Sequence, residues 1–155
     1  MKSPAELTHL FREQGLKVTP QRQLIFRVLH DDPTHPTAEA VHAVAAEVMP
    51  TMSLRTVYQT LNDLATMGEL QPLDLGTGST RFDPNVGAHH HLVCTACGKV
   101  RDVFVDVPGL DVPDAERHGF TITGADVVFR GLCDACAAAG IPQPSHPHTG
   151  KGANG

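Results

Sequence analysis

The sequence predicts an α+β fold, with helices in its first half and a small sheet in its second half. Three observations lead to this prediction. Four segments before residue 68 have apolar residues at helical spacing, and each follows a helix-capping residue. The segments after residue 69 are short and apolar and are bounded by glycine and proline, which is typical of strands. The four cysteines form two C-x-x-C pairs, which predict a metal site in the second half.

The first two predicted helices have clear beginnings. Ser3 and Glu6 form a capping box, and Gly15 ends the first helix. The second helix begins at Pro20, because proline suits the first turn of a helix. A loop that contains two prolines follows over residues 30–36.

The next two helices are predicted in the same way. Thr37 caps the third helix, which ends before a tight turn at residues 49–52, and Ser53 caps the fourth, which ends at Gly68. We expect the buried faces of the four helices to be formed by Leu7, Leu10 and Phe11 in the first, Leu24, Ile25, Val28 and Leu29 in the second, Val41, Val44, Ala45 and Val48 in the third, and Leu54, Val57, Leu61 and Leu64 in the fourth.

The polar face of the fourth helix carries residue types that contact phosphates and base edges. They lie near the N-terminus of the helix, where a recognition helix contacts the major groove: Arg55, Thr56, Tyr58 and Gln59. Residues 69–83 predict two short strands around a turn, and a hairpin after a helix-turn-helix is a wing. We therefore predict a winged helix-turn-helix domain over residues 1–83 that binds double-stranded DNA, with Arg22 at the phosphate backbone. In the plainer alternative, Tyr58 packs on the wing and Arg55 touches only phosphate.

The rest of the chain predicts a second, smaller domain. Residues 84–88 look like a hinge, and the domain spans residues 89–140. Its sheet is expected to have three strands, at residues 89–93, 100–105 and 120–131, with a short helix between Pro108 and His118. Residues 141–155 are rich in proline, glycine and histidine, so we expect a disordered tail.

The two cysteine pairs predict a tetrahedral zinc site. Its ligands would be Cys94, Cys97, Cys133 and Cys136. Such a site would join the first strand of the second domain to its last segment, and a closed site of four thiolates is structural rather than catalytic. The alternative of a redox pair is not favoured, because no βαβ pattern surrounds either motif.

Imidazole and carboxylate side chains predict a second metal site. His89 and His91 point to the same face of a strand, because side chains alternate, whereas Cys94 points to the other face. The candidate ligands are His35, Asp83, His89, His91 and Asp102. A set without thiolate suits iron, manganese, cobalt or nickel as well as zinc. If His35 joins this set, the metal connects the two domains and fixes the angle between them. Taken singly, each residue has a plainer alternative as a loop histidine or a solvated aspartate.

Composition argues for a soluble protein and mildly against nucleic-acid binding. The formal net charge is −5, although bound divalent cations would offset part of it. No apolar run is long enough to cross a bilayer, and we recognise no signal peptide. We therefore expect a cytoplasmic protein without a membrane partner.

From about residue 5 to residue 136, the sequence resembles the ferric uptake regulator (Fur) family. The resemblance rests on VTPQR at residues 18–22, HPTA at 35–38, SLRTVY at 53–58, RFD at 81–83, HHHLVC at 89–94, CGK at 97–99 and GLCDAC at 131–136. It implies a homodimeric, metal-dependent transcriptional repressor of palindromic operators and not an enzyme. The implied architecture is an N-terminal winged helix followed by a C-terminal α/β dimerisation domain.

Within that family, the ligand set resembles the peroxide-sensing (PerR) branch, which uses three histidines and two aspartates. Iron-uptake regulators proper more often carry glutamate at the positions of Asp83 and Asp102. A further metal site of some members uses a histidine where this chain has Ala88, so we do not expect that site in its usual form.

The same resemblance implies a signal and a response. Fe²⁺ or Mn²⁺ would fill the imidazole and carboxylate site, and Zn²⁺ the thiolate site. With ferrous iron, hydrogen peroxide would oxidise His35 or His89, the metal would leave and the DNA would be released. Manganese would keep the repressor on DNA without this reaction.

Four other functions remain open. The nearest is an iron-, zinc- or nickel-responsive repressor of the same fold without peroxide sensing, which operator choice and metal affinity would separate. A small metalloenzyme would need a general base, and none is obviously placed. A cysteine redox switch would lose zinc on oxidation. A zinc-containing RNA or protein adaptor would not need the capped, polar-faced fourth helix.

Overall fold

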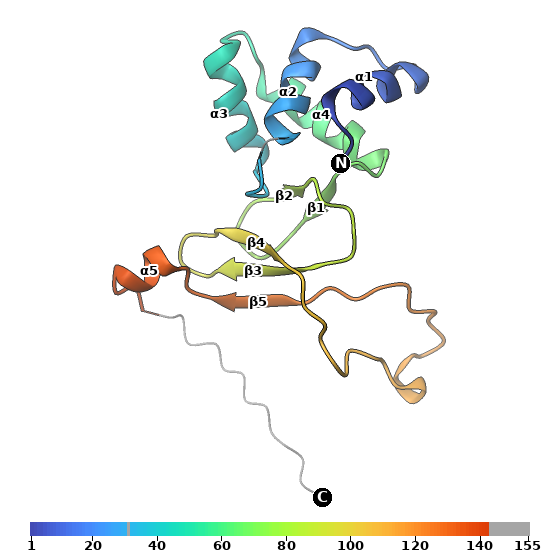
Figure 1. Cartoon of the computed structure of the whole chain (residues 1–155), viewed down its shortest axis with the longest axis vertical. Coiled ribbons are helices and arrows are strands. Elements are labelled where there is room, and N and C mark those ends of the chain that lie inside the picture. The colour runs from blue at the N-terminus through green and yellow to red at the C-terminus, as the bar shows by residue number, and fades with distance from the viewer. Residues whose placement is uncertain (31, 143–155) are drawn as a thin grey trace, which may run out of the picture.

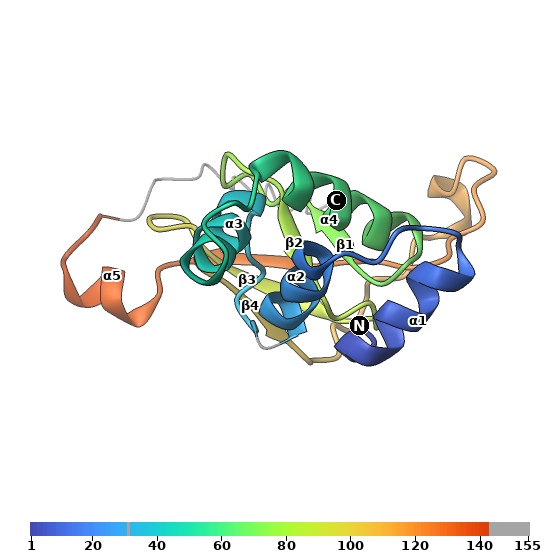
Figure 2. The ribbon, with the colours of Figure 1, turned by 90° about the horizontal axis from the view of Figure 1, so that it is seen from above.

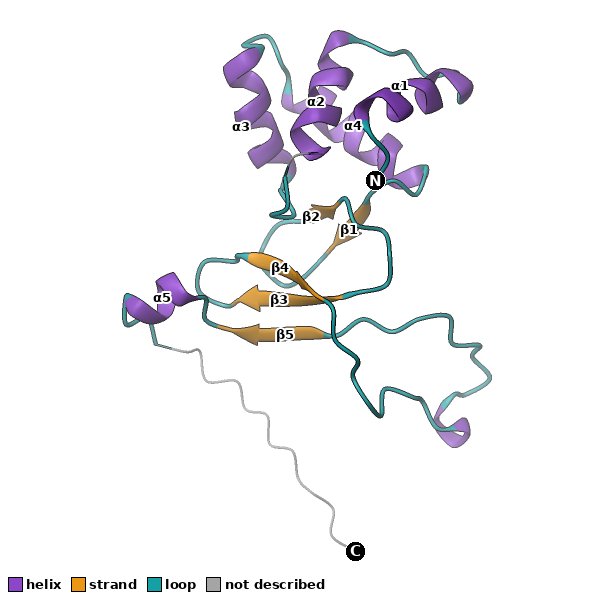
Figure 3. Ribbon diagram, in the orientation of Figure 1, coloured by secondary structure: helices purple, strands orange, loops and turns teal. Residues whose placement is uncertain are grey.

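The computed structural model describes residues 1–30 and 32–142. Its elements are helices α1 (Pro4–Glu13), α2 (Pro20–His30), α3 (Ala38–Val48), α4 (Leu54–Thr66) and α5 (Asp134–Ala138), the 3-10 turn η1 (Asp114–Glu116), and strands β1 (Gln71–Leu73), β2 (Arg81–Asp83), β3 (His90–Cys94), β4 (Val100–Val103) and β5 (Val128–Gly131). Figure 3 shows helices α1 to α4 gathered at one end, the strands below them, and α5 beside the three-stranded sheet. The α+β fold is therefore confirmed.

Helices α1 to α4 begin where the capping residues predict. Ser3 and Glu6 form a complete capping box, and the side chains of Thr37 and Ser53 accept hydrogen bonds from backbone N–H groups three residues later. The four helices share one core that also takes in Phe82 of β2. The N-terminal half is thus a helical bundle closed by the first hairpin.

The predicted inner face of α3 was partly wrong. Val44 and Val48 are 49% and 70% exposed, whereas Ala38, Val41 and Ala45 are buried. Val44 lies at the edge of the stripe formed by Ala38, Val41 and Ala45, and Val48 is the last residue of the helix, beyond the residues of α3 that pack in the core. Leu54 of α4 is also 37% exposed, because it lies in the first turn of the helix.

Two small sheets follow the helical bundle. Strands β1 and β2 pair antiparallel and form the predicted wing, and the second sheet has the order β4-β3-β5, with β3 antiparallel to β4 and parallel to β5. The wing lies between the helices and the three-stranded sheet (Figure 1), and the view from above in Figure 2 shows the helices lying over the strands. Leu73 and Leu75 of the wing segment pack on Val93 and Val100 of the sheet. The wing therefore belongs to the cores on both sides of it.

The C-terminal half contains less regular structure than predicted. The first strand begins one residue later than expected, the second ends at Val103, and the third covers only Val128–Gly131. The expected helix between residues 108 and 118 is reduced to η1, and the short helix α5 was not predicted. The segment between β4 and β5 forms an extended loop whose large apolar side chains, such as Phe120, are exposed.

Two of the sequence-based expectations remain predictions. The domain bounds of 1–83, 84–88 and 89–140 are not tested by the arrangement of elements alone. Apart from residues 141 and 142, the predicted disordered tail lies outside the described residues. Among the described helices, none is long and apolar enough to cross a membrane.

Candidate metal centres and DNA-binding face

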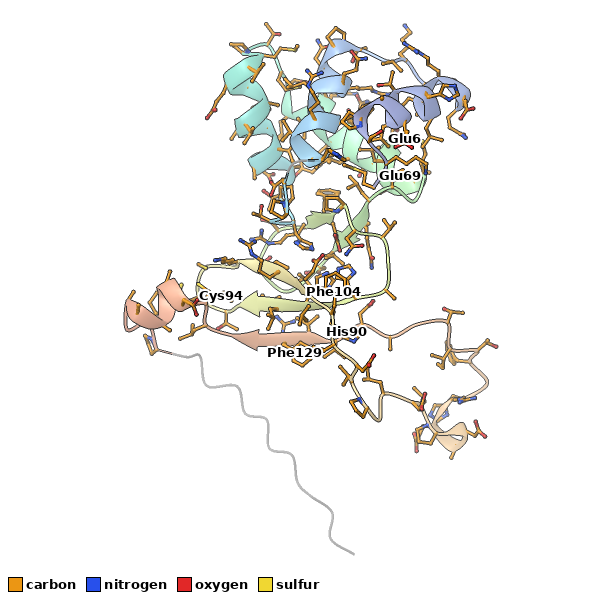
Figure 4. All side chains as sticks on the ribbon, viewed as in Figure 1. Glu6, Glu69, His90, Cys94, Phe104 and Phe129 are labelled. Atoms are coloured by element: carbon orange, nitrogen blue, oxygen red, sulfur yellow. The ribbon has the colours of Figure 1, made fainter. Side chains whose placement is uncertain are left out.

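The four cysteines come together at one end of the three-stranded sheet. Cys94 ends β3, Cys97 follows in the turn, and Cys133 and Cys136 flank the first turn of α5. Figure 4 labels Cys94 at the end of β3 that faces α5. The four cysteine Sγ atoms all lie within 4.8 Å of one another. The turn from Cys94 to Cys97 requires a left-handed backbone at Gly98, which has φ of 72°.

The geometry of this cluster fits tetrahedral zinc. Four sulfurs at about 2.3 Å from one ion lie about 3.8 Å apart, and the Sγ atoms of Cys97 and Cys133 are 3.7 Å apart. Backbone N–H groups of Cys97 and Cys133 lower the pKa of Cys94 to about 6. Hydrogen bonds with Cys133 and Cys97 raise the pKa of Cys136 to about 12. These opposite shifts follow from the close approach of the sulfurs, and binding of a zinc ion would displace the proton of the Cys136 thiol.

Three histidines and two aspartates form a second cluster between the two halves of the molecule. One donor atom from each residue lies within 4.8 Å of all the others, and the set is His35, Asp83, His89, His91 and Asp102. Asp83 ends β2, His91 and Asp102 are paired across β3 and β4, and His89 directly precedes β3. His35 comes from the loop between α2 and α3 and is 2% exposed. The cluster thus draws ligands from the helical half and from the sheet.

The loop at His35 has a strained backbone. Its φ of 54° is in the left-handed region, which costs a non-glycine residue on the order of 1–3 kcal/mol. The strand-like bridge between Thr37 and Arg81 and the hydrogen bond from Arg81 to the His35 carbonyl hold this loop against β2. These contacts explain how the strained conformation persists and why the imidazole points into the cluster.

Several donor atoms of this cluster lie close together without satisfying the geometry of a hydrogen bond. Nε2 of His35 lies 2.6 Å from Oδ1 of Asp102, and Nε2 of His89 lies 2.9 Å from Oδ2 of Asp83. Yet Nε2 of His35, Nε2 of His89 and Oδ1 of Asp102 are buried without a hydrogen-bond partner. Buried polar atoms are normally paired, so atoms that converge without pairing indicate a shared ion. Two ligands at about 2.1 Å from a metal and at right angles to each other would be about 3 Å apart.

Electrostatic coupling within the cluster is strong. Burial disfavours the charged form of His35, but the nearby carboxylates of Asp83 and Asp102 outweigh it and raise the pKa of His35. Burial also opposes ionisation of Asp83, but the adjacent His35 imidazole and the hydrogen bond from the Asn85 N–H lower the pKa of Asp83. A metal ion would replace the proton on His35 as the positive partner of the two carboxylates.

Two residues of the loop after β2, Asn85 and Gly87, contact these ligands, although the sequence predicted only a hinge there. The amide of Asn85 donates to Oδ2 of Asp102, and the carbonyl of Gly87 lies 2.7 Å from Nδ1 of His89. An asparagine two residues before a glycine is a local signal for a turn, but the contact with Asp102 depends on the tertiary fold.

The predicted DNA-binding side chains lie on one exposed face of α4. Tyr58 is 40% exposed, and its hydroxyl donates to Oε1 of Glu39 on α3 at 2.7 Å, so it is directed to α3 and not to the wing. The hydrogen bond to Tyr58 lowers the pKa of Glu39. Arg55 and Gln59 are exposed, and Thr56 is half-buried.

Arg22 is held inside the helical half. Its guanidinium donates to Asp63 at 2.7 Å and to the Lys17 carbonyl at 3.2 Å, and it lies 5.1 Å from the centre of the Phe11 ring. These contacts compete with the predicted contact to phosphate, which stays a prediction.

Known proteins match this chain over both halves. The model of the ferric uptake regulator family matches residues 13–130. The peroxide-responsive repressor PerR of Staphylococcus epidermidis is 34% identical over 132 residues, which are 83% of this chain and 87% of the relative. PerR of Staphylococcus aureus strain COL is 34% identical over 130 residues, which are 81% of this chain and 85% of the relative.

Solved structures show the same fold. A zinc-bound manganese uptake regulator has a TM-score of 0.64 at 26% identity and covers 85% of this chain and 99% of its own. PerR from Streptococcus pyogenes, described with its peroxide sensing and gene regulation, has a TM-score of 0.51 at 28% identity and covers 88% of this chain and 94% of its own. The ferric uptake regulator Fur of Helicobacter pylori has a TM-score of 0.68 at 22% identity, and this match concerns the fold alone.

Proposed function

Because the chain belongs to the ferric uptake regulator family, whose members are metal-dependent transcription regulators and not enzymes, we propose that it is a peroxide-sensing repressor. Metal binding at His35, Asp83, His89, His91 and Asp102 holds the DNA-reading helices at a fixed angle to the sheet. The observation that carries this proposal is the convergence of buried, unpartnered donor atoms from both halves of the molecule on one point. A repressor acts on the chromosome, so the cytoplasmic location predicted above belongs to this proposal.

The thiolate cluster holds structural zinc in this proposal. The sulfur spacing supports a tetrahedral ion of the size of zinc. A relative with the same fold is named as a zinc-bound regulator. The ion ties the turn after β3 to α5, so it stabilises the part of the chain that has the smaller apolar core.

The nitrogen and oxygen cluster holds Fe²⁺ or Mn²⁺. Ferrous iron bound there would supply the reducing electrons that activate hydrogen peroxide. In the net reaction, peroxide gives one oxygen atom to an imidazole carbon of His35 or His89 and leaves as water, so the histidine is oxidised and peroxide is reduced. An oxidised imidazole binds metal more weakly, which frees the loop of His35 from the sheet and releases the DNA-reading helices from their fixed angle.

The outer face of the three-stranded sheet supports the proposed homodimer. Strand pairing places His90, Leu92 and Phe129 on the face that points away from the wing, and Figure 4 labels His90 and Phe129 side by side there. Leu92 is 48% exposed and Phe129 is 37% exposed. Exposed large apolar side chains on a sheet face are typical of a protein–protein interface, and a second copy of the chain is the partner that the family relationship favours.

Phe129→Asp is therefore expected to convert the dimer into a monomer and to abolish operator binding. The added carboxylate would lie in an apolar interface without a partner, which costs several kcal/mol. Sedimentation velocity measures the change in mass, and Phe120→Asp on the exposed loop serves as a second interface variant. A fully dimeric F129D protein would show that the outer face of the sheet is not the interface.

Tyr58→Ala is expected to weaken operator binding by about 1–3 kcal/mol and to relax its sequence preference. The reason is that Tyr58 is exposed on the reading face of α4, where its hydroxyl is held by Glu39. Fluorescence anisotropy with the operator and with shuffled DNA measures both quantities. Tyr58→Phe keeps the ring and removes only the bond to Glu39. An equal loss on both DNAs would assign Tyr58 to phosphate contact instead.

The direct test of the proposed function is the binding of promoter DNA by the zinc-containing protein with its second site empty, loaded with Mn²⁺, or loaded with Fe²⁺. Both metals should strengthen binding, and peroxide should reverse this only in the iron form. Metal-independent DNA binding would contradict the proposal.

A second candidate is a metal-responsive repressor without peroxide sensing. The observation that favours it is that the manganese uptake regulator superposes with a higher TM-score than PerR from Streptococcus pyogenes, although their sequence identities to this chain are similar. In that case Mn²⁺ would still strengthen DNA binding, and peroxide would have no effect on the iron form.

A further inference from the structure

The loop after β2 is placed against the metal ligands. Sequence alone suggested that residues 84–88 are a hinge, but two residues of this loop contact three of the five ligands. The backbone N–H of Asn85 donates to Oδ1 of Asp83 at 2.7 Å, and its side-chain amide donates to Oδ2 of Asp102 at 3.1 Å. The carbonyl of Gly87 lies 2.7 Å from Nδ1 of His89, which directs the proton to Nδ1 and leaves Nε2 for a metal.

The orientation of the Asn85 amide is determined by a third contact. The backbone N–H of Gly87 donates to Oδ1 of Asn85 at 3.2 Å, so the carbonyl end of the amide is fixed. The NH₂ end must then face Asp102, because a flipped amide would lose both hydrogen bonds. The orientation of the Asn85 amide is therefore fixed by its own loop, independently of its contact with Asp102.

Asp102 needs such support more than the other ligands do. Its side chain is 23% exposed, whereas those of His35, Asp83, His89 and His91 are 1–3% exposed. Burial and packing fix the rotamers of the four buried ligands, but they do not fix the rotamer of Asp102. The Asn85 amide occupies Oδ2 and leaves Oδ1, which lies 2.6 Å from Nε2 of His35, as the donor that faces the cluster.

Asn85 also lies where solvent approaches this side of the cluster. A cavity of about 260 Å³ is lined by Asn85 and Arg101 together with three of the ligands, His35, Asp83 and Asp102. Small molecules that enter this cavity meet Asp102 beside the Asn85 amide. The residue therefore stands at the boundary between the buried ligands and the solvent.

We propose that Asn85 is a positioning residue of the regulatory metal site, which holds Asp102 so that a single carboxylate oxygen faces the metal. This inference rests on the proposed function, because it assumes that the cluster binds a metal. It adds a role for a residue that binds no metal itself. The amide sets the affinity of the site and the geometry of its most exposed ligand.

Asn85→Ala is expected to weaken Mn²⁺ binding to the zinc-containing protein by about 10–100-fold, which is the usual effect of losing a residue that orients a metal ligand. Competition with a fluorescent chelator measures this affinity. Loading with Co²⁺ gives a second readout, because its visible absorption bands report the geometry of the ligands. The bands should shift in N85A, since both oxygens of Asp102 become free to bind. A change in folding alone would not produce a bound cobalt with a new spectrum.

Two further variants make this test specific. Asn62→Ala makes the same chemical change on the exposed face of α4 and should leave Mn²⁺ affinity and the cobalt spectrum unchanged. Asn85→Asp keeps the acceptor for the Gly87 N–H but replaces the donor to Asp102 with a carboxylate oxygen that repels it, so it should also shift the cobalt spectrum. It also serves if N85A does not fold.

Each outcome has a separate meaning. Wild-type affinity and an unchanged cobalt spectrum in N85A, or in N85D if N85A does not fold, would overturn the role of Asn85 and leave the proposed function standing. A wild-type protein that binds neither Mn²⁺ nor Co²⁺ at this cluster would overturn the proposed function itself.

Discussion

Cys133→Ser will release zinc and unfold the three-stranded part of the protein, while the helices of the N-terminal half stay folded. A structural zinc site of thiolates contributes about 10–16 kcal/mol of apparent binding free energy, which is as large as the whole net stability of a typical domain, about 5–15 kcal/mol. The second core cannot replace this contribution, because within residues 32–142 its buried members are Leu73, Leu75, Val93 and Val100 alone. Elemental analysis measures the zinc, and amide hydrogen exchange locates the unfolding.

Ala135→Ser is the matched control for this experiment. It introduces the same hydroxyl at an exposed position of α5 between the two cysteines, so zinc content and exchange should remain those of the wild type. Slow exchange across β3 and β5 in zinc-free C133S would contradict a structural role of the thiolate site.

His35→Ala will remove the effect of metal on DNA binding and leave zinc in place. Among the described ligands, His35 alone lies between two helices, whereas Asp83 lies in the wing and the other three lie in or next to the three-stranded sheet. Its loss therefore separates the helices from the metal. Allosteric couplings typically amount to about 1–3 kcal/mol, or about 5–150-fold in affinity, and we expect this ratio to fall to nearly one in the variant. Operator affinity with and without Mn²⁺ measures it.

The control for His35→Ala is His9→Ala on the exposed side of α1, which should keep the full response to Mn²⁺. If H35A still bound the operator more tightly with Mn²⁺ than without it, the loop of His35 would not be the link between the metal and the DNA-reading helices.

Local signals predicted the N-terminal half well. Ser3, Thr37 and Ser53 fixed the starts of three helices, because a cap acts within four residues of itself. The inner face of α3 was harder, since all of its alanines and valines are apolar and only packing decides which are buried. Val44 and Val48 were assigned inward because they lie at helical spacing from Val41 and Ala45, and the structure leaves them exposed.

The C-terminal half shows what local signals cannot decide. Phe120 and Ile122 have the residue type of a strand, but no neighbouring strand pairs with them and both are exposed in the described chain. Their burial would depend on a partner subunit, which a single sequence does not display. Helix α5 has five residues, too few for a helical periodicity to be recognised.

The sequence identified the residues of the two metal sites to different extents. The cysteine spacing identifies the thiolate cluster by itself. His35 could be joined to the other ligands only through the family resemblance, because helices α3 and α4 and strand β1 separate it from Asp83 in the chain. No sequence pattern relates Asn85 to Asp102, since their contact arises only when β4 pairs with β3.

Peptide mass spectrometry tests the central claim most directly. The zinc-containing protein is loaded with Fe²⁺, given a brief, low dose of hydrogen peroxide and digested, with the Mn²⁺-loaded protein as the control. The account predicts one added oxygen on the peptide that contains His35 or His89, only in the iron form, with zinc and all four thiolates retained. Unmodified histidines in the iron form, together with oxidised cysteines and lost zinc, would contradict it.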